Sequence, residues 1–400
     1  MKVGIDARFI GAQGTGLGKY TEKLIQNLQK IDQTNQYCIF LKEENWDYQK
    51  LSKNFKKVLA DVNWYTLKEQ IKLPAIYKKE NLDVLHVPHF NVPVFYRGKF
   101  VVTIHDLIHH QFSETTATTR NPLIFKGKRL AYRQVIGHAI SKSKKIITPS
   151  KYIRSQIIEQ YKVPENKIAV TYEAAEEEYF APSRHPELIG PKPRIAGQGP
   201  HGTVYSGSVL KKYQIKKPFL IYVGNAYPHK NLDNLLTAFS FIAFDFAKQN
   251  LSTLSLIIVC ARDIFAKRLE EKIKSLGLQN RVILTGYIGA NELPLIFKSA
   301  EAYVFPTLSE GFGIPGLNAL ASQLPLVCSN IPVLKEIYGQ TATYYNPQDP
   351  ADIAKKIKGV LSDSKTRTDL VKKGNEQVKK YSWSKMAKQT LDIYEASAKL

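Results

Sequence analysis

Cysteine is scarce in this chain of 400 residues, which has only Cys38, Cys260 and Cys328, far apart in the sequence. Three scattered cysteines exclude a disulfide framework and give no pattern of zinc ligands, so we expect them to be small buried side chains. Long apolar runs are also lacking, because no stretch reaches the roughly 20 residues of a membrane-spanning helix. The chain opens directly on an apolar strand, without a charged segment followed by an apolar one, and this favours a cytoplasmic protein.

Acidic residues are in deficit, since 35 Asp and Glu face 57 Lys and Arg and the net charge is +22. Such a charge attracts polyanions, whether nucleic acid, an anionic membrane or a phosphorylated substrate. The lysine clusters are not interleaved with a recognisable nucleic-acid-binding module, so we expect no nucleic-acid partner. A proteome rich in lysine would produce the same excess.

One basic segment has the composition of a peripheral membrane contact. Its apolar residues 122–125 are flanked by five cations, Arg120, Lys126, Lys128, Arg129 and Arg133. Such a segment can lie on anionic headgroups, here at the inner face of a membrane. The alternative is a solvated helix whose apolar side packs into the core, and the sequence leaves both interpretations open.

Apolar runs and amphipathic segments alternate in two series, which predicts two domains with parallel α/β sheets. The expected strands are 2–9, 37–41, 84–87, 100–105, 145–149 and 167–172, then 219–223, 254–260, 282–287, 302–305 and 326–328. The expected helices are 18–31, 122–141 and 151–161, then 232–246, 264–275, 292–298, 316–322 and 350–361. Residues 183–217 are rich in Pro and Gly and indicate a linker with an insertion. We therefore expect one domain over 1–182 and a second over 218–382.

The most informative segment joins the strand 302–305 to the helix that follows it. Its residues Gly311, Phe312, Gly313 and Ile314 form a glycine turn that opens a helix. The free N–H groups and positive dipole end of such a helix bind anions such as phosphate. Glu310, just before them, offers a carboxylate that accepts hydrogen bonds from hydroxyls. The segment fits a sugar nucleotide, and an ordinary strand–turn–helix is the alternative.

This segment resembles the nucleotide-sugar motif of retaining GT-B glycosyltransferases of family 4. In that family a Glu and a Gly-Phe-Gly turn are followed by a second Glu, which accepts hydrogen bonds from the ribose. Glu310 matches the first Glu, but Asn318 occupies the position of the second. The resemblance implies two Rossmann-like domains facing across a cleft, with the helix 383–400 returning to the first domain. It also predicts that Asn318→Glu strengthens nucleotide binding or leaves it unchanged.

A second glycine loop, at 14–18, follows the first expected strand and opens the first helix. It permits a close approach of backbone N–H groups to phosphate, but a plain tight turn has the same sequence. A dinucleotide site is weakly supported, because no acidic residue follows the second strand in the expected place. The resemblance assigns Gly16 and Gly18 to the donor site.

Two further strand ends carry candidate residues, because open α/β sheets bind ligands at the carboxyl ends of their strands. His105 and Asp106 end the strand 100–105. The resemblance implies that His105 touches the donor sugar and that Asp106 belongs to the donor site.

The other strand end leads from Gly224 and Asn225 to Lys230. Lys230 supplies the positive charge that a diphosphate demands. The family usually has a basic residue where this chain has Asn225, so Lys230 carries more of the diphosphate contact.

Together these features predict a hexosyltransferase that acts without cofactor or metal ion, with His105, Lys230 and Glu310 as catalytic residues. The resemblance favours GDP-mannose as donor, with a UDP-sugar close behind, and a glycan or lipid-linked acceptor. No Asp-X-Asp motif of the kind that metal-dependent transferases use ends a strand. Two other classes stay open, namely a decayed transferase that binds polyanions or membranes, and an NAD-dependent oxidoreductase.

Overall fold

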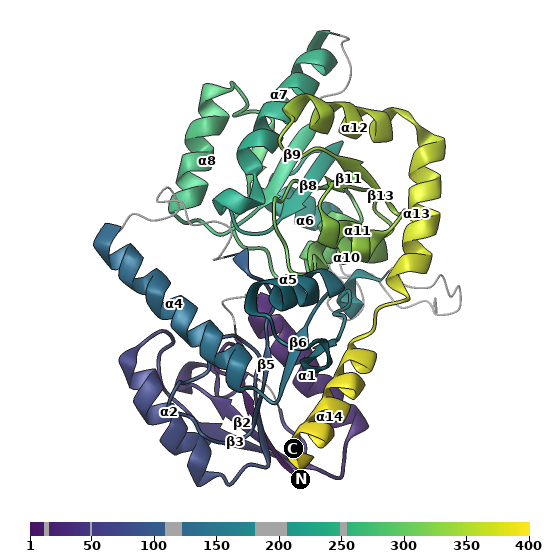
Figure 1. Ribbon diagram of the computed structural model, residues 1–400. Helices are drawn as coiled ribbons and strands as arrows, with labels where there is room; N and C mark the ends of the chain where they lie inside the picture. Colours follow the sequence, from purple (N-terminus) through teal and green to yellow (C-terminus); the bar gives the residue numbers. More distant parts are fainter. Residues whose placement is uncertain (12–15, 49, 109–121, 181–205, 249–253) are drawn as a thin grey trace, which may run out of the picture. The chain divides into compact units, whose positions relative to one another are not determined.

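A computed structural model describes residues 1–400 except 12–15, 49, 109–121, 181–205 and 249–253 (Figure 1). The chain divides into two compact units. Unit 1 comprises Met1–Glu173 and Tyr381–Leu400, and unit 2 comprises Ala174–Lys380. The passage between them lies earlier than the expected boundary at 182, because Ala174 and Ala175 are buried and Tyr179 packs edge-on against Phe297 of unit 2.

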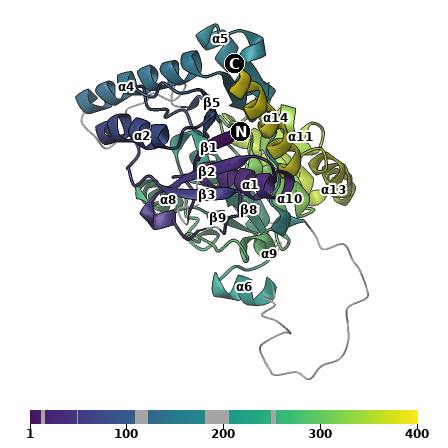
Figure 2. The same cartoon turned by 90° about the horizontal axis from the view of Figure 1, so that it is seen from below.

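Unit 1 contains one parallel sheet of seven strands in the order β3-β2-β1-β4-β5-β6-β7, whose first strands lie next to one another in Figure 2. The strands are β1 (Lys2–Asp6), β2 (Gln36–Leu41), β3 (Phe55–Leu59), β4 (Val84–Val87), β5 (Phe100–Thr103), β6 (Lys145–Thr148) and β7 (Ile168–Val170). The helices are α1 (Gly16–Ile31), α2 (Leu67–Lys79), α4 (Pro122–Lys142), α5 (Lys151–Tyr161) and α14 (Trp383–Lys399).

Unit 2 contains a parallel sheet of six strands in the order β10-β9-β8-β11-β12-β13. Its strands are β8 (Phe219–Val223), β9 (Ser255–Val259), β10 (Val282–Leu284), β11 (Ala302–Phe305), β12 (Leu326–Ser329) and β13 (Ala342–Tyr345). Its helices are α6 (Ser206–Lys212), α7 (Leu232–Lys248), α8 (Ile264–Ser275), α9 (Leu293–Phe297), α10 (Ile314–Ala321), α11 (Pro332–Tyr338), α12 (Pro350–Ser362) and α13 (Ser364–Val378).

The strand order reverses once in each sheet, between β1 and β4 in unit 1 and between β8 and β11 in unit 2. Right-handed crossovers on the two sides of a reversal place their helices on opposite faces of the sheet. The loops that leave the two flanking strands therefore diverge and open a crevice at the carboxyl edge. Both units have the doubly wound, Rossmann-like architecture that the alternating pattern predicts, and that prediction is confirmed.

The C-terminal helix α14 belongs to unit 1, where it lies beside α1 (Figure 1). Ser382 caps its first turn by accepting a hydrogen bond from the N–H of Lys385. Its buried face includes Trp383, Met386, Leu391 and Tyr394. The chain thus leaves unit 2 after α13 and ends on unit 1.

Six elements are absent from the sequence-based expectation, namely the strands β3 and β13 and the helices α2, α6, α11 and α13. Strands β3 and β13 are the outer strands of their sheets, and β3 carries Lys56 and Lys57, which obscure its apolar pattern. Helix α2 contains Pro74, and α13 buries only Leu370, Gly374, Gln377 and Val378 of its fifteen residues. All three cysteines are free and buried, as expected.

Candidate active site

Two loops meet at the carboxyl edge of unit 2, one after β8 and one after β11. Lys230 ends the first loop and Glu310 lies in the second, and Lys230 Nζ donates a hydrogen bond to Glu310 Oε1 at 2.5 Å. Both side chains are largely buried, at 14% and 12% exposure. The backbone N–H of Leu308 donates to the carbonyl of His229 at 2.8 Å and joins the same two loops. Because β8 and β11 flank the reversal of strand order, the ion pair lies at the crevice where such sheets bind ligands.

The turn before α10 has a backbone that glycine alone adopts readily. Gly313 has φ of 99°, and a Cβ there would also collide with the Tyr338 hydroxyl. That hydroxyl donates to the Gly313 carbonyl at 2.5 Å and fixes the turn from α11. Phe312 is buried, and Pro315 occupies the first turn of α10. Helix α10 thus begins at a turn held by α11, after the carboxyl end of β11, and the first N–H groups of a helix can bind an anion.

Gly224 and Asn225 shape the loop that leads to Lys230. The N–H of Gly224 donates to the carbonyl of Val259 at 3.0 Å and continues the strand pairing by one residue. The hydroxyl of Tyr222 donates to the carbonyl of Asn225 at 2.9 Å, and the Asn225 side chain accepts the N–H of Tyr227 at 3.4 Å. Asn225 therefore has a structural part in this loop.

Asn318 lies in the second turn of α10 and is 4% exposed. Both ends of its amide contact Glu176, which lies shortly after the passage into unit 2. No sequence pattern singles out Glu176, because it stands within an acidic run, 176–178, at the end of the first expected domain.

In unit 1 the glycine loop is described from Gly16 onward, and Gly14 and Thr15 lie outside the described residues. A Cβ on Gly18 would lie 2.5 Å from the carbonyl oxygen of Phe9, so Gly18 allows α1 to pack against the chain after β1. A Cβ on Gly16 would meet nothing within 4 Å in the described chain. Gly18 has a packing function, and Gly16 leaves open space at the start of α1.

His105 follows β5 and makes contacts on both sides of its ring. Its Nδ1 lies 3.2 Å from Glu173 Oε1, and its Nε2 lies 3.1 Å from the carbonyl oxygen of Pro88. The ring of Tyr20 packs edge-on against it at 4.6 Å. Because both oxygens accept hydrogen bonds, an imidazolium donates to both, whereas a neutral ring donates to one. Asp106 accepts the N–H of Ile108 at 3.0 Å and shapes the next turn.

A buried hydrogen-bonded chain supports Tyr20 from beneath. His86 on β4 lies 2.6 Å from the hydroxyl of Tyr394 and 2.8 Å from Thr103 Oγ1, which is 3.3 Å from the hydroxyl of Tyr20. Burial, with a smaller contribution from His105, lowers the pKa of His86 to about 3. His86 is therefore neutral, and it ties α14 to the strand that carries His105.

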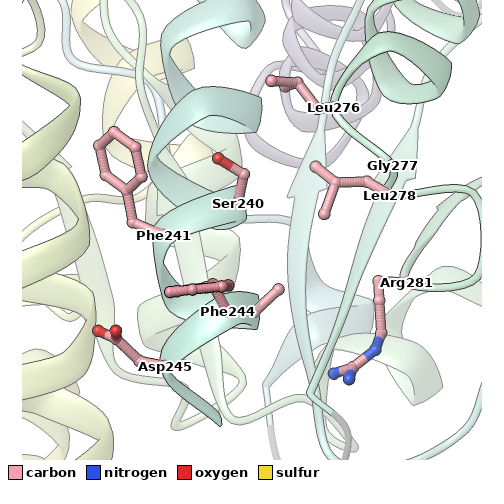
Figure 3. A pocket seen from close by; sticks show the side chains of 9 residues that line it. Ser240, Phe241, Phe244, Asp245, Leu276, Gly277, Leu278 and Arg281 are labelled. Atoms are coloured by element: carbon pink, nitrogen blue, oxygen red, sulfur yellow. The ribbon is translucent and has the colours of Figure 1, made fainter. Parts of the chain in front are cut away.

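A hollow in unit 2 lies away from these loops. It has a volume of about 560 Å³ and is lined by side chains such as Phe241, Phe244, Leu278 and Arg281 (Figure 3). Arg281 immediately precedes β10, so the hollow lies at the amino edge of the sheet. It is separate from the crevice at the carboxyl edge that holds Lys230 and Glu310.

Within the described ranges, no helix is long and apolar enough to cross a membrane. No cluster of three or more His, Cys, Asp or Glu side chains suited to a metal ion occurs among those same residues. Of the expected membrane segment, Arg120 lies outside the described residues, whereas 122–129 belong to α4.

Two protein families match this chain in sequence. Residues 16–178 match the family described as Glycosyltransferase Family 4, and residues 210–377 match Glycosyl transferases group 1. The O-antigen chain mannosyltransferase RfbU of Salmonella typhimurium is 24% identical over 94% of this chain and 95% of its own length. The O-antigen chain mannosyltransferase B of Escherichia coli is 27% identical over 78% of this chain and 74% of its own.

Among solved structures, sucrose-phosphate synthase from Thermosynechococcus elongatus superimposes with a TM-score of 0.75 at 17% identity. The match covers 99% of this chain and 98% of that one, so the likeness in fold extends over both units. The two family matches cover Gly16, Gly18 and His105 in the first half, and Lys230, Glu310 and α10 in the second. The chain is therefore a glycosyltransferase of the GT-B fold that belongs to glycosyltransferase family 4 and group 1.

Proposed function

We propose that this glycosyltransferase moves mannose from GDP-mannose to a hydroxyl of a glycan or lipid-linked acceptor. It retains the anomeric configuration and needs no divalent metal. The choice of mannose is supported by the relatives named as O-antigen chain mannosyltransferases, one of which matches along 95% of its length. Retention and metal independence rest on the resemblance of the site to family 4.

The observation that carries the proposal is the ion pair of Lys230 and Glu310 at the reversal of strand order in unit 2. An ammonium group and a carboxylate side by side suit a ligand that carries both phosphate and hydroxyls. Among the described residues, Glu310 is the one hydrogen-bond partner of the Lys230 ammonium, which has three N–H groups. The lysine is thus held in place and can still donate to a diphosphate.

The chemical demand on the site is the negative charge that grows on the leaving diphosphate. Fixed positive groups that face this charge lower the barrier, and Lys230 and the first N–H groups of α10 supply them. In the proposed step the bond between C1 of the sugar and the diphosphate oxygen breaks, while the acceptor oxygen bonds to C1 on the same face. The proton of the acceptor hydroxyl passes to the departing diphosphate. Glu310 orients the sugar hydroxyls.

His105 is proposed to contact the transferred sugar. Both ring nitrogens have hydrogen-bond partners within unit 1, so a hydrogen bond to the sugar requires that one of these two partners be given up. The carbonyl of Pro88 is the easier partner to exchange, because it is uncharged, whereas a carboxylate makes a stronger hydrogen bond to an imidazolium.

A thermal-shift panel of GDP, UDP, ADP and NAD tests the donor, because a ligand that binds the native state raises the melting temperature. We expect GDP to give the largest shift. A larger shift with UDP would mean that the donor is a UDP-sugar, and a shift with NAD alone would overturn the proposal.

Transfer from GDP-mannose measured with and without EDTA tests the metal requirement. NMR of the anomeric configuration of the product tests retention.

Peripheral membrane contact is proposed on the basis of the net charge of +22 and the basic segment at the start of α4. Basic residues near an anionic leaflet contribute about 1 kcal/mol each. Cosedimentation with anionic and neutral vesicles across a salt series measures this contribution. Equal recovery with both lipids contradicts the membrane contact and leaves the transfer reaction unaffected.

A further inference from the structure

Both polar atoms of the Asn318 amide form hydrogen bonds with Glu176, which is 142 positions away in the sequence. Asn318 Oδ1 accepts the backbone N–H of Glu176 at 3.0 Å, and Asn318 Nδ2 donates to Glu176 Oε1 at 3.3 Å. Because a backbone N–H can only donate, the amide oxygen of Asn318, and not its nitrogen, must face the N–H of Glu176. The amide nitrogen must then face the carboxylate.

We propose that Glu176 supplies the carboxylate that binds the ribose hydroxyls of the nucleotide, and that Asn318 is its positioning residue. The inference rests on the proposed function and names a further ligand-binding residue in the same site. An ionised carboxylate accepts about four hydrogen bonds on its two oxygens, so one carboxylate can accept from an amide and from a ribose diol together. Hydroxyl groups donate strongly to such an acceptor.

The position of Asn318 along α10 agrees with this assignment. Asn318 is four residues beyond Ile314, where the helix begins, which corresponds to roughly 6 Å along the axis. With the diphosphate at the helix N-terminus, the ribose is the next part of the ligand. Glu176, held against Asn318, therefore lies at the depth that the ribose occupies.

This pairing also explains why an amide stands where the resembling family has a carboxylate. In Asn318→Glu the donor to Glu176 is lost and a second carboxylate is placed within hydrogen-bond reach of the first. Two like charges at that distance repel each other, and the pair cannot easily be ionised together. We therefore expect Asn318→Glu to weaken nucleotide binding, opposite to the expectation from the family resemblance.

Calorimetric titration of the full chain with GDP and with 2′,3′-dideoxy-GDP tests the inference. Wild type should bind GDP at least tenfold more tightly than the dideoxy compound. Glu176→Gln should weaken GDP binding about tenfold and remove this discrimination. Glu178→Gln is the matched control, because Glu178 is exposed in the same segment, and it should behave as wild type.

Two further variants separate the carboxylate from the fold around it. Asn318→Glu should weaken GDP binding, and the double variant Glu176→Gln with Asn318→Glu should recover part of the loss, because an amide again faces a carboxylate. Unchanged binding and discrimination in Glu176→Gln overturns the inference, as does equal weakening of GDP and dideoxy-GDP. If wild type binds UDP in place of GDP, the same comparison is made with UDP and 2′,3′-dideoxy-UDP, whereas failure to bind any nucleoside diphosphate contradicts the proposed function itself.

Discussion

Each unit has a cation of low exposure in the chain that follows its first strand, next to the reversal of strand order, and the two cations differ in their partners. Arg8 follows β1 and is 1% exposed. Its Nε and Nη2 donate to Asp6, Nη2 also donates to Glu69, and Nη1 donates to the carbonyl of Val62. Lys230 follows β8, is 14% exposed, and donates to Glu310 alone among the described residues.

The difference indicates a structural ion pair in unit 1 and supports the ligand-binding function proposed for the pair in unit 2. The guanidinium of Arg8 is enclosed by protein acceptors, so its charge serves the fold of unit 1. The ammonium of Lys230 has one acceptor, Glu310, among the residues that the structure describes, and under the proposed function its remaining N–H groups donate to the diphosphate. The number of protein partners in the described chain thus distinguishes the two basic residues, and we expect them to differ in function in the same way.

The largest expected effect is on the stability of unit 1. Arg8→Met leaves the carboxylates of Asp6 and Glu69 buried without their cation, and removal of one partner from a buried ion pair costs about 3–5 kcal/mol. Urea denaturation measures the loss, and hydrogen exchange shows whether it is confined to unit 1. Lys56→Met is the control, since Lys56 is 63% exposed and its pair with Glu80 should contribute less than about 1 kcal/mol. Equal losses in the two variants would break the comparison.

The next effect is on catalysis in unit 2. Lys230→Ala should lower kcat/KM for transfer about 10²–10³-fold, or about 2.7–4 kcal/mol, because the lysine faces charge that develops in the transition state. The melting temperature should change little by comparison. Lys212→Ala removes an exposed lysine that also pairs with a glutamate, Glu292, and should leave the rate unchanged. A near-normal rate in Lys230→Ala would show that the diphosphate is held by other groups.

A pH effect distinguishes the buried histidine of unit 1. His86 titrates near about 6.5 in the unfolded chain, whereas burial lowers its pKa in the folded protein to about 3. Between these values the unfolded state binds a proton that the folded state does not, so the free energy of unfolding falls as the pH falls, by up to about 1.4 kcal/mol per pH unit. His86→Gln should show a shallower slope over this window in denaturation series. Identical slopes would mean that His86 is protonated in the fold.

The smallest effect concerns two buried tyrosine hydroxyls, one in each unit, each of which makes one hydrogen bond that holds a neighbouring segment in place. Tyr338→Phe removes the hydrogen bond to the Gly313 carbonyl, worth about 1 kcal/mol, and should weaken nucleotide binding about fivefold by loosening the turn before α10. Tyr394→Phe removes the hydrogen bond to His86 and should lower the stability of unit 1 while leaving nucleotide affinity unchanged. Calorimetric titration and thermal melts of both variants decide the matter. A loss of affinity in Tyr394→Phe would contradict the separation of the two roles.

The sequence predicts where the site lies, and that position stays a prediction. Alternating apolar and amphipathic segments indicate parallel α/β domains, and residues after strand ends are candidates for a site, which led to Lys230 and Glu310. Their direct contact agrees with that reasoning. The roles assigned to His105 and to the glycine loop of unit 1 remain predictions, as does the arrangement of the two units across a cleft.

Local sequence determined the strands, the helices and the glycine turn at Gly313, because these depend on neighbours within a few residues. Tertiary structure alone decided the rest. It paired Glu176 with Asn318 and surrounded Arg8 with the acceptors Asp6, Val62 and Glu69. It also supplied a hydrogen-bond partner to each ring nitrogen of His105. It also brought the weakly patterned outer strands β3 and β13 into their sheets. Such contacts join residues far apart in the chain, and whether a charged side chain has a structural or a ligand-binding role depends on those contacts.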